Sequence, residues 1–436
     1  MNFSRSQLII TGSVIFIVLL VVGIVTGIIP GVRKNTEKLP EINLTVWGID
    51  NEDLFRENFI GYQVLRPNVQ TRYKQLNPDT YERDFINALA SGTGPDIIMF
   101  HNSWLPKHLT KIIPVGEDQL SLNSLKQLFP TVIEQDFAPD NKIYALPLYM
   151  DTLALFYNQD IFDRNGIAIS PKDWLDFQNL IPKLRQKNAD GKIAKAAAAI
   201  GGSSNSIYKA PDLLMLLMLQ AGTKMTDDEF TQATFTQNIG GLFPGLDALN
   251  FYTKFSDPTE LYYTWDDTFE YSPDSFAKGD TAIIFAYASE KENLRSKNPF
   301  LSFKTAEIPQ LSGSDKAVTF PDYWGLAVTN NSENPEWAWD LILYLTANET
   351  AAENYIRISD RPPALRNVIQ KYTDHPELGV FAKQALFARS WPRIDEKIID
   401  QAFSDMIRSI LEKQLKAKDA LEQAEKQVTE LMRARR

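Results

Sequence analysis

The chain has 436 residues, of which 44% are hydrophobic and 23% are charged, with a formal net charge of −10. This composition is that of an ordinary globular protein, so it excludes disordered, collagen-like and multi-spanning membrane proteins, and the acidic balance argues against nucleic-acid binding. No cysteine is present, which excludes disulfide scaffolds, thiolate metal sites, thiol catalysis and a lipid attached to cysteine.

The first element along the chain is a 22-residue apolar run from Leu8 to Ile29, whose polar members are two threonines and one serine. A helix of this length spans about 33 Å, enough for a hydrocarbon core of about 30 Å. A cleaved signal peptide has a shorter apolar region and small residues at its cut site, and no convincing site follows here. We expect residues 1–34 to form an N-terminal transmembrane anchor, with a cleaved signal as the alternative, and residues 35–40 to form a linker.

Positive charges flank this apolar run on both sides. Arg5 and the α-amino group precede it, whereas Arg33, Lys34 and Lys38 follow it. Because positive residues favour the cytoplasmic side of a membrane, the charge count alone favours a cytoplasmic body.

The body of the chain, from Glu41 onward, alternates short β-rich runs with amphipathic helical runs. Residues 41–47 alternate polar and apolar side chains before Gly48, which predicts a strand and a turn. The pair Ser170-Pro171 predicts the start of a helix. The other predicted elements are a helix over 81–91, a buried strand over 96–100, a helix end and a strand over 277–285, a helix over 336–345 and nearly continuous helix over 395–436. Strands separated by helices indicate a parallel sheet and the α/β class.

Catalytic and cofactor motifs are absent from the sequence. It contains no nucleophile elbow, no phosphate-binding loop, no zinc-protease helix and no dinucleotide fingerprint. The three histidines, His101, His108 and His375, are scattered, and a metal site from them is not expected. Neighbouring acids such as Asp266 and Asp267 could serve a glycosidase only if they faced each other across a bond. We therefore expect no enzyme activity, no metal and no cofactor.

Aromatic and polar side chains gather where the predicted strands end or begin. In open α/β sheets, ligands bind outside the carboxyl ends of the strands. Aromatic faces stack on sugar rings while carboxylates and amides bond the hydroxyls, so the set suits a neutral polyhydroxylated ligand; the alternative for each aromatic alone is core packing. The residues are Trp47, Asp50 and Asn51; His101, Asn102, Ser103 and Trp104; Tyr149 and Asp151; Tyr287; and Asp322, Tyr323 and Trp324.

Several segments resemble, in order, the extracellular solute-binding proteins of ABC importers, in the large branch that includes maltose-binding protein. No single motif is specific, but the ordered set covers about residues 41–430. The segments are SGTGPDII over 91–98, IYALPL over 143–148, LFYNQDIF over 155–162, FAKGDTAI over 276–283, WGLAV over 324–328 and NPEWAW over 334–339.

The resemblance implies a periplasmic-binding-protein clamshell with discontinuous lobes. One lobe would comprise residues 41–149 plus 324–368, and the other residues 150–323 plus 369–436. A sugar or oligosaccharide would bind between the lobes and drive hinge closure, and the closed monomer would dock on ABC permease subunits. The alternative is a membrane-tethered sensor, or a binding protein for a non-sugar solute.

The resemblance also implies a location and further ligand contacts. It places the body on the extracytoplasmic side, against the charge count, because long domains translocate largely regardless of flanking charge. The family's usual lipid-bearing cysteine is missing, which leaves residues 8–29 as the expected membrane attachment. Trp391 and Arg393 match family positions that can close the cleft, and Arg361 lies in a matching proline-rich segment, where it either faces the cleft or forms a structural ion pair. All three join the strand-end residues as expected ligand contacts.

Overall fold

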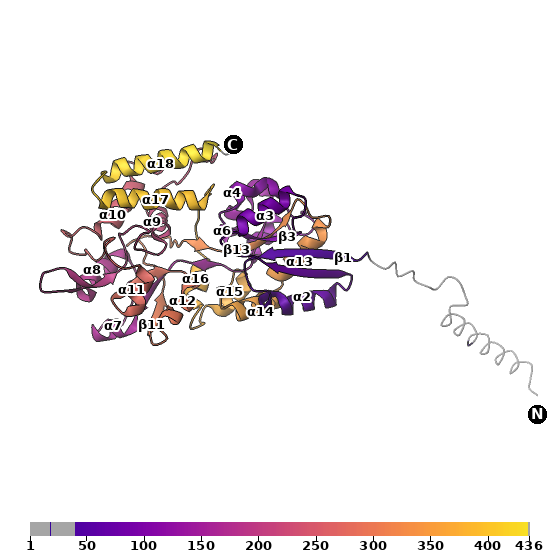
Figure 1. Ribbon diagram of the computed structural model, residues 1–436, viewed down its shortest axis with the longest axis horizontal. Coiled ribbons are helices and arrows are strands. Elements are labelled where there is room, and N and C mark those ends of the chain that lie inside the picture. Colours follow the sequence, from indigo (N-terminus) through magenta and orange to yellow (C-terminus); the bar gives the residue numbers. More distant parts are fainter. Residues whose placement is uncertain (1–17, 19–39, 435–436) are drawn as a thin grey trace, which may run out of the picture.

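The computed structural model describes residue 18 and residues 40–434, and residues 40–434 form two lobes (Figure 1). Apart from Val18 and Pro40, the expected anchor and linker over residues 1–40 lie outside the described residues. Among the residues that are described, no helix is both long enough and apolar enough to cross a membrane.

The first lobe is built on a six-stranded sheet with the order β2-β1-β3-β13-β4, with β5 paired to β13. β1 runs parallel to β2 and β3, whereas β13 runs antiparallel to β3, β4 and β5. All five residues of β3 are buried, which explains its uninterrupted apolar sequence up to its last residue, His101. The strands are β1 (Ile42–Gly48), β2 (Val69–Gln75), β3 (Ile97–His101), β4 (Ile112–Ile113), β5 (Leu146–Pro147) and β13 (Trp324–Thr329).

Helices cover the first sheet, and their buried faces complete a core that includes Leu44, Phe85 and Trp339. Tyr81 lies at the start of α3 and donates a hydrogen bond to the carbonyl oxygen of Met99 in β3. The helices are α2 (Asp53–Leu65), α3 (Tyr81–Ala90), α4 (Leu105–His108), α5 (Leu122–Leu128), α6 (Thr131–Phe137), α13 (Pro335–Ala347), α14 (Glu349–Ser359), α15 (Arg366–Tyr372) and α16 (Gly379–Ala385). Two short 3₁₀ turns, η1 (Leu109–Lys111) and η2 (Pro139–Asn141), follow α4 and α6.

The second lobe has its own five-stranded sheet, in the order β11-β7-β10-β9-β8, and its own core. Its central strand, β10, runs parallel to β9 and antiparallel to β7. The strands are β7 (Ala154–Asn158), β8 (Gln186–Lys187), β9 (Ile193–Ala198), β10 (Thr281–Ala286) and β11 (Phe303–Ala306). The helices are α7 (Gln159–Arg164), α8 (Trp174–Leu184), α9 (Ala210–Gln220), α10 (Pro244–Lys254), α11 (Ser272–Lys278), α12 (Glu290–Lys297), α17 (Glu396–Leu411) and α18 (Ala417–Ala434).

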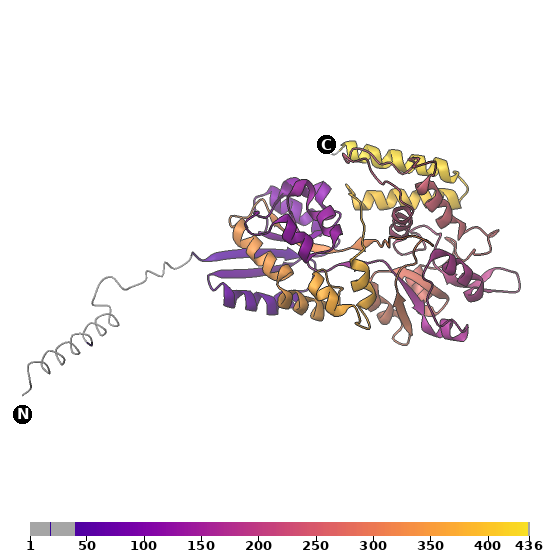
Figure 2. The same ribbon diagram turned by 180° about the vertical axis from the view of Figure 1, so that it is seen from behind.

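A two-stranded sheet of β6 (Asp151–Thr152) and β12 (Pro321–Asp322) lies where the chain passes between the two cores. The first core ends at Met150 and resumes at Tyr323, and the second core begins at Leu153 and includes Phe320. α16 contributes to both cores, through Phe381 on one side and Ala382 and Ala385 on the other. The last two helices, α17 and α18, lie along the second lobe in both views (Figures 1 and 2).

Two expectations about elements need correction. Both large sheets are mixed rather than purely parallel. The helix expected at Ser170-Pro171 begins at Trp174, because the side chain of Asp173 accepts the backbone N–H of Asp176 at 2.8 Å and caps it. The nearly continuous helix expected over 395–436 is present as two helices, α17 and α18, with a break after Leu411, where Lys413 takes a left-handed conformation with φ 57°.

A candidate ligand-binding cleft between the lobes

Two chambers lie between the lobes, and each is lined by residues of both. The first, which we call the ionic chamber, has a volume of about 250 Å³. Its lining residues are Pro78, Glu82, His101, Ser103, Trp104, Lys107, Lys209, Asp322, Trp324 and residues 394–397. The second, which we call the apolar chamber, has a volume of about 530 Å³. Its lining residues are Asn102, Leu105, Pro106, Leu109, Thr131, Glu134, Gln135, Asp136, Ala138, Pro139, Asp140, Phe230, Trp391, Pro392 and Arg393.

His101, the last residue of β3, is held between carboxylates of two different segments. Its Nε2 lies 2.7 Å from Asp322 Oδ1, and its Nδ1 lies 3.1 Å from Glu396 Oε2. Burial alone would lower the pKa of the imidazole, but the charges and hydrogen bonds of Glu396 and Asp322 outweigh it and raise the pKa to about 9. His101 is therefore an imidazolium at neutral pH.

Two tryptophans form an aromatic wall of the ionic chamber. The ring centroids of Trp104 and Trp324 are 5.0 Å apart with planes at 72°, and Trp324 also packs edge-on against His101 at 5.0 Å. β13 brings these residues together, because its antiparallel register pairs Trp324 directly with His101. Both indoles remain partly exposed, so the wall can accept the face of a ligand.

Lys209 enters the ionic chamber from the second lobe. It has a left-handed backbone with φ 53° and precedes α9, whose first turn contains Pro211. Its Nζ lies 3.2 Å from Asp322 Oδ2 and 3.7 Å from Asp212 Oδ2, and it sits 5.7 Å from the ring centroid of Tyr287. The Tyr287 hydroxyl donates to Asp212 Oδ2 at 2.8 Å, which fixes the carboxylate beneath the lysine.

Arg393 is 2% exposed and has three carboxylates around it without a close bond to any. Its Nη1 lies 3.7 to 3.8 Å from oxygens of Asp212, Glu396 and Asp400. Within the described part of the chain, Arg393 Nη1, Asp212 Oδ1 and Asp400 Oδ1 have no hydrogen-bond partner. Burying charged atoms without hydrogen bonds lowers the stability of a protein. These three atoms therefore form a small buried polar cluster whose hydrogen bonds are not all made.

Asp136, in α6, is a half-buried acid of the apolar chamber. Its Oδ2 accepts the Tyr323 hydroxyl at 2.7 Å and the Asn102 amide at 3.3 Å, and its Oδ1 accepts the Ser390 hydroxyl. Burial raises the pKa of this carboxyl to about 6, against these hydrogen bonds.

Direct contacts cross from one lobe to the other around the chambers. Ser103 Oγ donates to Glu396 Oε2 at 2.8 Å, and Lys107 Nζ lies 2.8 Å from Asp395 Oδ2. Gln135 Nε2 donates to the carbonyl oxygen of Ser390 at 2.7 Å. The structure therefore holds the two lobes together in a closed arrangement.

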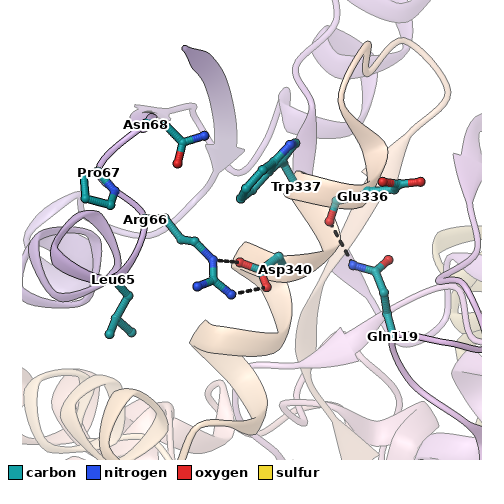
Figure 3. Close-up of a pocket in the computed structure, with 8 residues that line it drawn as sticks. All are labelled: Leu65, Arg66, Pro67, Asn68, Gln119, Glu336, Trp337 and Asp340. Atoms are coloured by element: carbon teal, nitrogen blue, oxygen red, sulfur yellow. Dashed lines mark hydrogen bonds and ion pairs between the residues drawn. The ribbon is translucent and has the colours of Figure 1, made fainter. Parts of the chain in front are cut away.

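A further pocket of about 350 Å³ lies within the first lobe alone (Figure 3). Arg66 forms a bidentate ion pair with Asp340 there, beside Trp337. Gln119 donates a hydrogen bond to the carbonyl oxygen of Glu336. Because residues of only one lobe line it, hinge closure would not enclose a ligand in this pocket.

Comparison with known proteins identifies the family. The model of the bacterial extracellular solute-binding protein family matches residues 66–380. The chain belongs to this family. It is therefore a solute-binding protein of the extracytoplasmic side, and it binds its solute rather than converting it chemically.

Individual relatives of this solute-binding protein are distant in sequence. A protein of Brucella abortus described only as a binding protein is 20% identical over 83% of this chain and 86% of its own length. A galactooligosaccharide-binding protein of Bacillus subtilis is 22% identical over 64% of this chain and 62% of its own length. The crystal structure of a cyclic α-maltosyl-1,6-maltose binding protein from Arthrobacter globiformis has a TM-score of 0.75 at 17% identity, covering 91% of this chain and all of that one. The shared fold is the α/β two-lobed binding-protein fold.

The structure of the solute-binding protein brings about half of the expected ligand contacts to the two chambers. His101, Trp104 and Trp324 line the ionic chamber, and so does Asp322. Tyr287 and Tyr323 line neither chamber. Their hydroxyls donate hydrogen bonds to Asp212 and Asp136. The expected residues that line the apolar chamber are Asn102, Trp391 and Arg393.

A second group of expected contacts lies in the first lobe and lines neither chamber. Arg361 bonds both carboxylate oxygens of Asp50, at 2.8 and 3.1 Å, and its guanidinium lies 4.4 Å from the ring centroid of Tyr149. Trp47 packs under the ammonium of Lys74 at 4.2 Å, and Asn51 is exposed.

Asp151 also lies away from both chambers, in the strand pair between the lobes. Its carboxylate accepts the backbone N–H groups of Thr152, Ala288 and Ser289 at 2.8 to 3.0 Å. It therefore ties β6 to the loop before α12.

Several chamber residues have little signal in the sequence. Lys209 precedes an Ala-Pro pair at a helix start, which predicts the helix but not the direction of the ammonium group. Asp136 and Glu396 lie in acidic, helical sequence, where a surface position is the ordinary expectation.

Proposed function

We propose that this solute-binding protein is the substrate-binding component of an ABC importer and binds a sugar or an oligosaccharide between its lobes. The observation that carries the proposal is the composition of the two chambers. Trp104, Trp324 and Trp391 supply aromatic surface, while carboxylates, amides and basic groups from both lobes supply hydrogen bonds. The ligands named for the Bacillus subtilis relative and the Arthrobacter globiformis structure are also saccharides.

The mechanism is reversible closure of the two lobes around the ligand. A ligand shifts the equilibrium toward the closed form only by the difference between its binding free energies for the closed and the open form. His101 and Trp104 belong to the first lobe, whereas Lys209 and Glu396 belong to the second, so a ligand touching both groups gains contacts on closing. The closed form then presents both lobes together to a permease.

We also propose that residues 8–29 tether the protein to the membrane, with the body on the extracytoplasmic side. The length of the apolar run and the absence of cysteine support the tether. Protease added to intact cells should digest the body. A body that is protected until the cells are lysed would contradict this orientation.

Calorimetric titration of the full chain with mono- and oligosaccharides tests the binding proposal. We expect at least one saccharide to bind, and Trp324→Ala to weaken binding about 10-fold or more through loss of stacking area. Trp337→Ala is the matched control, because this tryptophan lies at the pocket of Figure 3 and should leave the affinity unchanged. Binding of peptides or amino acids with no response to any saccharide would refute the carbohydrate assignment.

A further inference from the structure

Helix α2 presents three large apolar side chains to solvent near its C-terminal end. Ile60, Val64 and Leu65 are 60%, 75% and 58% exposed, whereas Phe55 and Tyr62 of the same helix pack into the core of the first lobe. Residues four apart on a helix are neighbours on its surface, so Ile60 and Val64 lie side by side. We call the three exposed side chains the α2 patch.

Leu65 continues the α2 patch into the pocket of Figure 3. Pro67 and Trp337 line this pocket together with Leu65, and the side chain of Trp337 is half-buried. A tryptophan at the surface combines an apolar ring with a polar N–H group, which suits the boundary between water and lipid. Aliphatic and aromatic surface therefore lie close together at the end of α2.

The chain enters the folded body beside this patch. The side-chain amide of Asn68 donates a hydrogen bond to the carbonyl oxygen of Pro40 at 3.2 Å, and the carbonyl oxygen of Asn68 accepts the N–H of Ile42 at 2.8 Å. Asn68 follows Leu65 by three residues, a length of chain that spans about 11 Å at most. In both views, β1 begins at the end of the first lobe that points away from the second lobe (Figures 1 and 2). The α2 patch therefore lies near the entry point of the chain, at the free end of the first lobe.

A membrane anchor over residues 8–29 would keep this end of the first lobe close to the bilayer. Pro40 comes 11 residues after Ile29 in the sequence, and an extended chain covers about 40 Å at most over that length. A short tether of this kind supplies an effective concentration on the order of 1 mM. A surface that binds lipid weakly by itself is therefore docked for much of the time when it is tethered.

The charged side chains beside the α2 patch are paired with partners of opposite sign. Glu57 pairs with Arg357 at 3.0 Å, and Arg66 forms its bidentate pair with Asp340. Because the charges within each pair offset one another, attraction to a membrane would come mainly from the apolar side chains. Dissolved salt screens attraction between charges, so it should have little effect on this contact.

We propose that the α2 patch docks on the surface of the lipid bilayer to which residues 8–29 tether the protein. This inference rests on the tether in the proposed function and adds a second membrane contact to it. Ile60, Val64 and Leu65 leave water and insert among the lipid headgroups, and binding of this kind strengthens with the apolar area that is buried. The two chambers lie between the lobes, away from the docked end, so the docked protein can still bind its ligand.

Fluorescence quenching at a single labelled position of the full chain tests this inference. Because the chain has no cysteine, Gln63→Cys provides one attachment point for a fluorescent label, at an exposed position beside Ile60 and Val64. The labelled protein is reconstituted into vesicles of phosphatidylcholine and phosphatidylglycerol in which some headgroups carry a nitroxide quencher. Leu261→Cys is the matched control, because Leu261 is 82% exposed and belongs to the second lobe. We expect strong quenching at position 63, at low and at high salt, and little at position 261.

Ile60→Ser combined with Val64→Ser removes apolar surface from the patch, and both side chains are exposed enough for the fold to tolerate the change. With the label at position 63, the pair should lower the ratio of docked to undocked protein about tenfold, the factor for losing the burial of an aliphatic side chain. Ligand affinity, measured by calorimetry, should stay the same. Ile169→Ser is the matched control, because Ile169 is 71% exposed in the second lobe, and it should leave the quenching unchanged.

The outcomes separate this inference from the proposed tether, because flotation of the protein with the vesicles reports the tether alone. If the full chain does not float with them, the tether fails and the docking inference fails with it. If it floats but position 63 is quenched no more than position 261, the tether stands and docking fails, as it would if a second copy or a permease covered the patch instead. Equal quenching of the serine variant, or loss of quenching at high salt, would also overturn docking through the patch.

Discussion

His101 links the charge state of one side chain to the contact between the lobes. The residues that face it are Asp322 and Glu396, with Lys209 next to Asp322. A histidine pKa raised from its ordinary 6.5 to about 9 stabilises the folded state fully below pH 6.5, and this contribution is lost as the pH rises through 9.

The substitution His101→Gln should therefore have an effect that depends on pH. We expect the difference in melting temperature between the wild type and the variant to be largest below pH 6.5 and to shrink between pH 6.5 and 9. Thermal unfolding of both proteins at a series of pH values measures this difference. Taking the difference cancels the contributions of buried aspartates such as Asp151, whose burial raises its pKa and therefore also lowers the stability of the folded state as the pH rises. A difference that does not vary with pH would show that His101 is not an imidazolium.

Asp151 illustrates a buried acid whose hydrogen bonds are all internal. Asp151→Asn would turn an amide group toward at least one of its three N–H donors, leaving buried polar groups unpaired. We expect the free energy of unfolding to fall by about 1–3 kcal/mol for such a loss. Thermal or urea denaturation checks it. A variant that keeps its stability but loses ligand affinity would instead indicate that Asp151 contacts the ligand.

Gly325 shows how tightly β13, an inner strand of the first sheet, is packed. A Cβ atom placed there would lie 2.3 Å from the carbonyl oxygen of Leu146 in the neighbouring β5. Gly325→Ala must therefore push a backbone segment aside, and we expect a loss of about 2 kcal/mol or more. Gly92→Ala is a suitable comparison, because its φ of +72° costs about 1 kcal/mol while no atom lies within 4 Å. Equal melting temperatures for the two variants would contradict the packing argument.

The elements with strong local patterns could be predicted from the sequence, whereas their directions could not. The strand before Gly48, the helix from Tyr81 and the buried strand before His101 are all present. The antiparallel direction of β13 has no local signal, because alternation and burial look the same in both directions. Chamber residues at the ends of strands, such as His101 and Trp324, could be predicted because ligands in α/β sheets bind near strand ends. Asp136 and Lys209 depend on helix packing, and their sequence context does not distinguish them from surface charges.

Contacts between the lobes set the balance between open and closed forms of the whole molecule. Lys107 bonds Asp395 across the cleft at 2.8 Å and Glu82 within its own lobe at 2.7 Å. Lys107→Met keeps the apolar stem but removes both bonds, the one to Asp395 across the cleft and the one to Glu82 within the first lobe. The side chains of Lys107 and Asp395 are 20% and 8% exposed, so solvent screens this pair less than a surface pair worth about 1 kcal/mol or less. We therefore expect ligand affinity to fall by about fivefold or more and the ligand-free protein to expand.

Small-angle X-ray scattering and calorimetry measure these two effects. Lys278→Met removes an exposed ion pair with Glu270 inside the second lobe, and it should change neither quantity. Identical scattering and affinity for Lys107→Met and the wild type would show that this contact does not influence closure.

The position of β13 in the first sheet also bears on how the protein is made and exported. β3 and β4 are neighbours in the chain, yet β13 lies between them and is synthesised only after most of the second lobe. Pairing between such distant segments is slow, because the intervening chain must first be brought together. The emerging polypeptide therefore lacks a complete first lobe for most of its synthesis, and a chain that has not yet folded is the form that can be threaded through a narrow secretion channel.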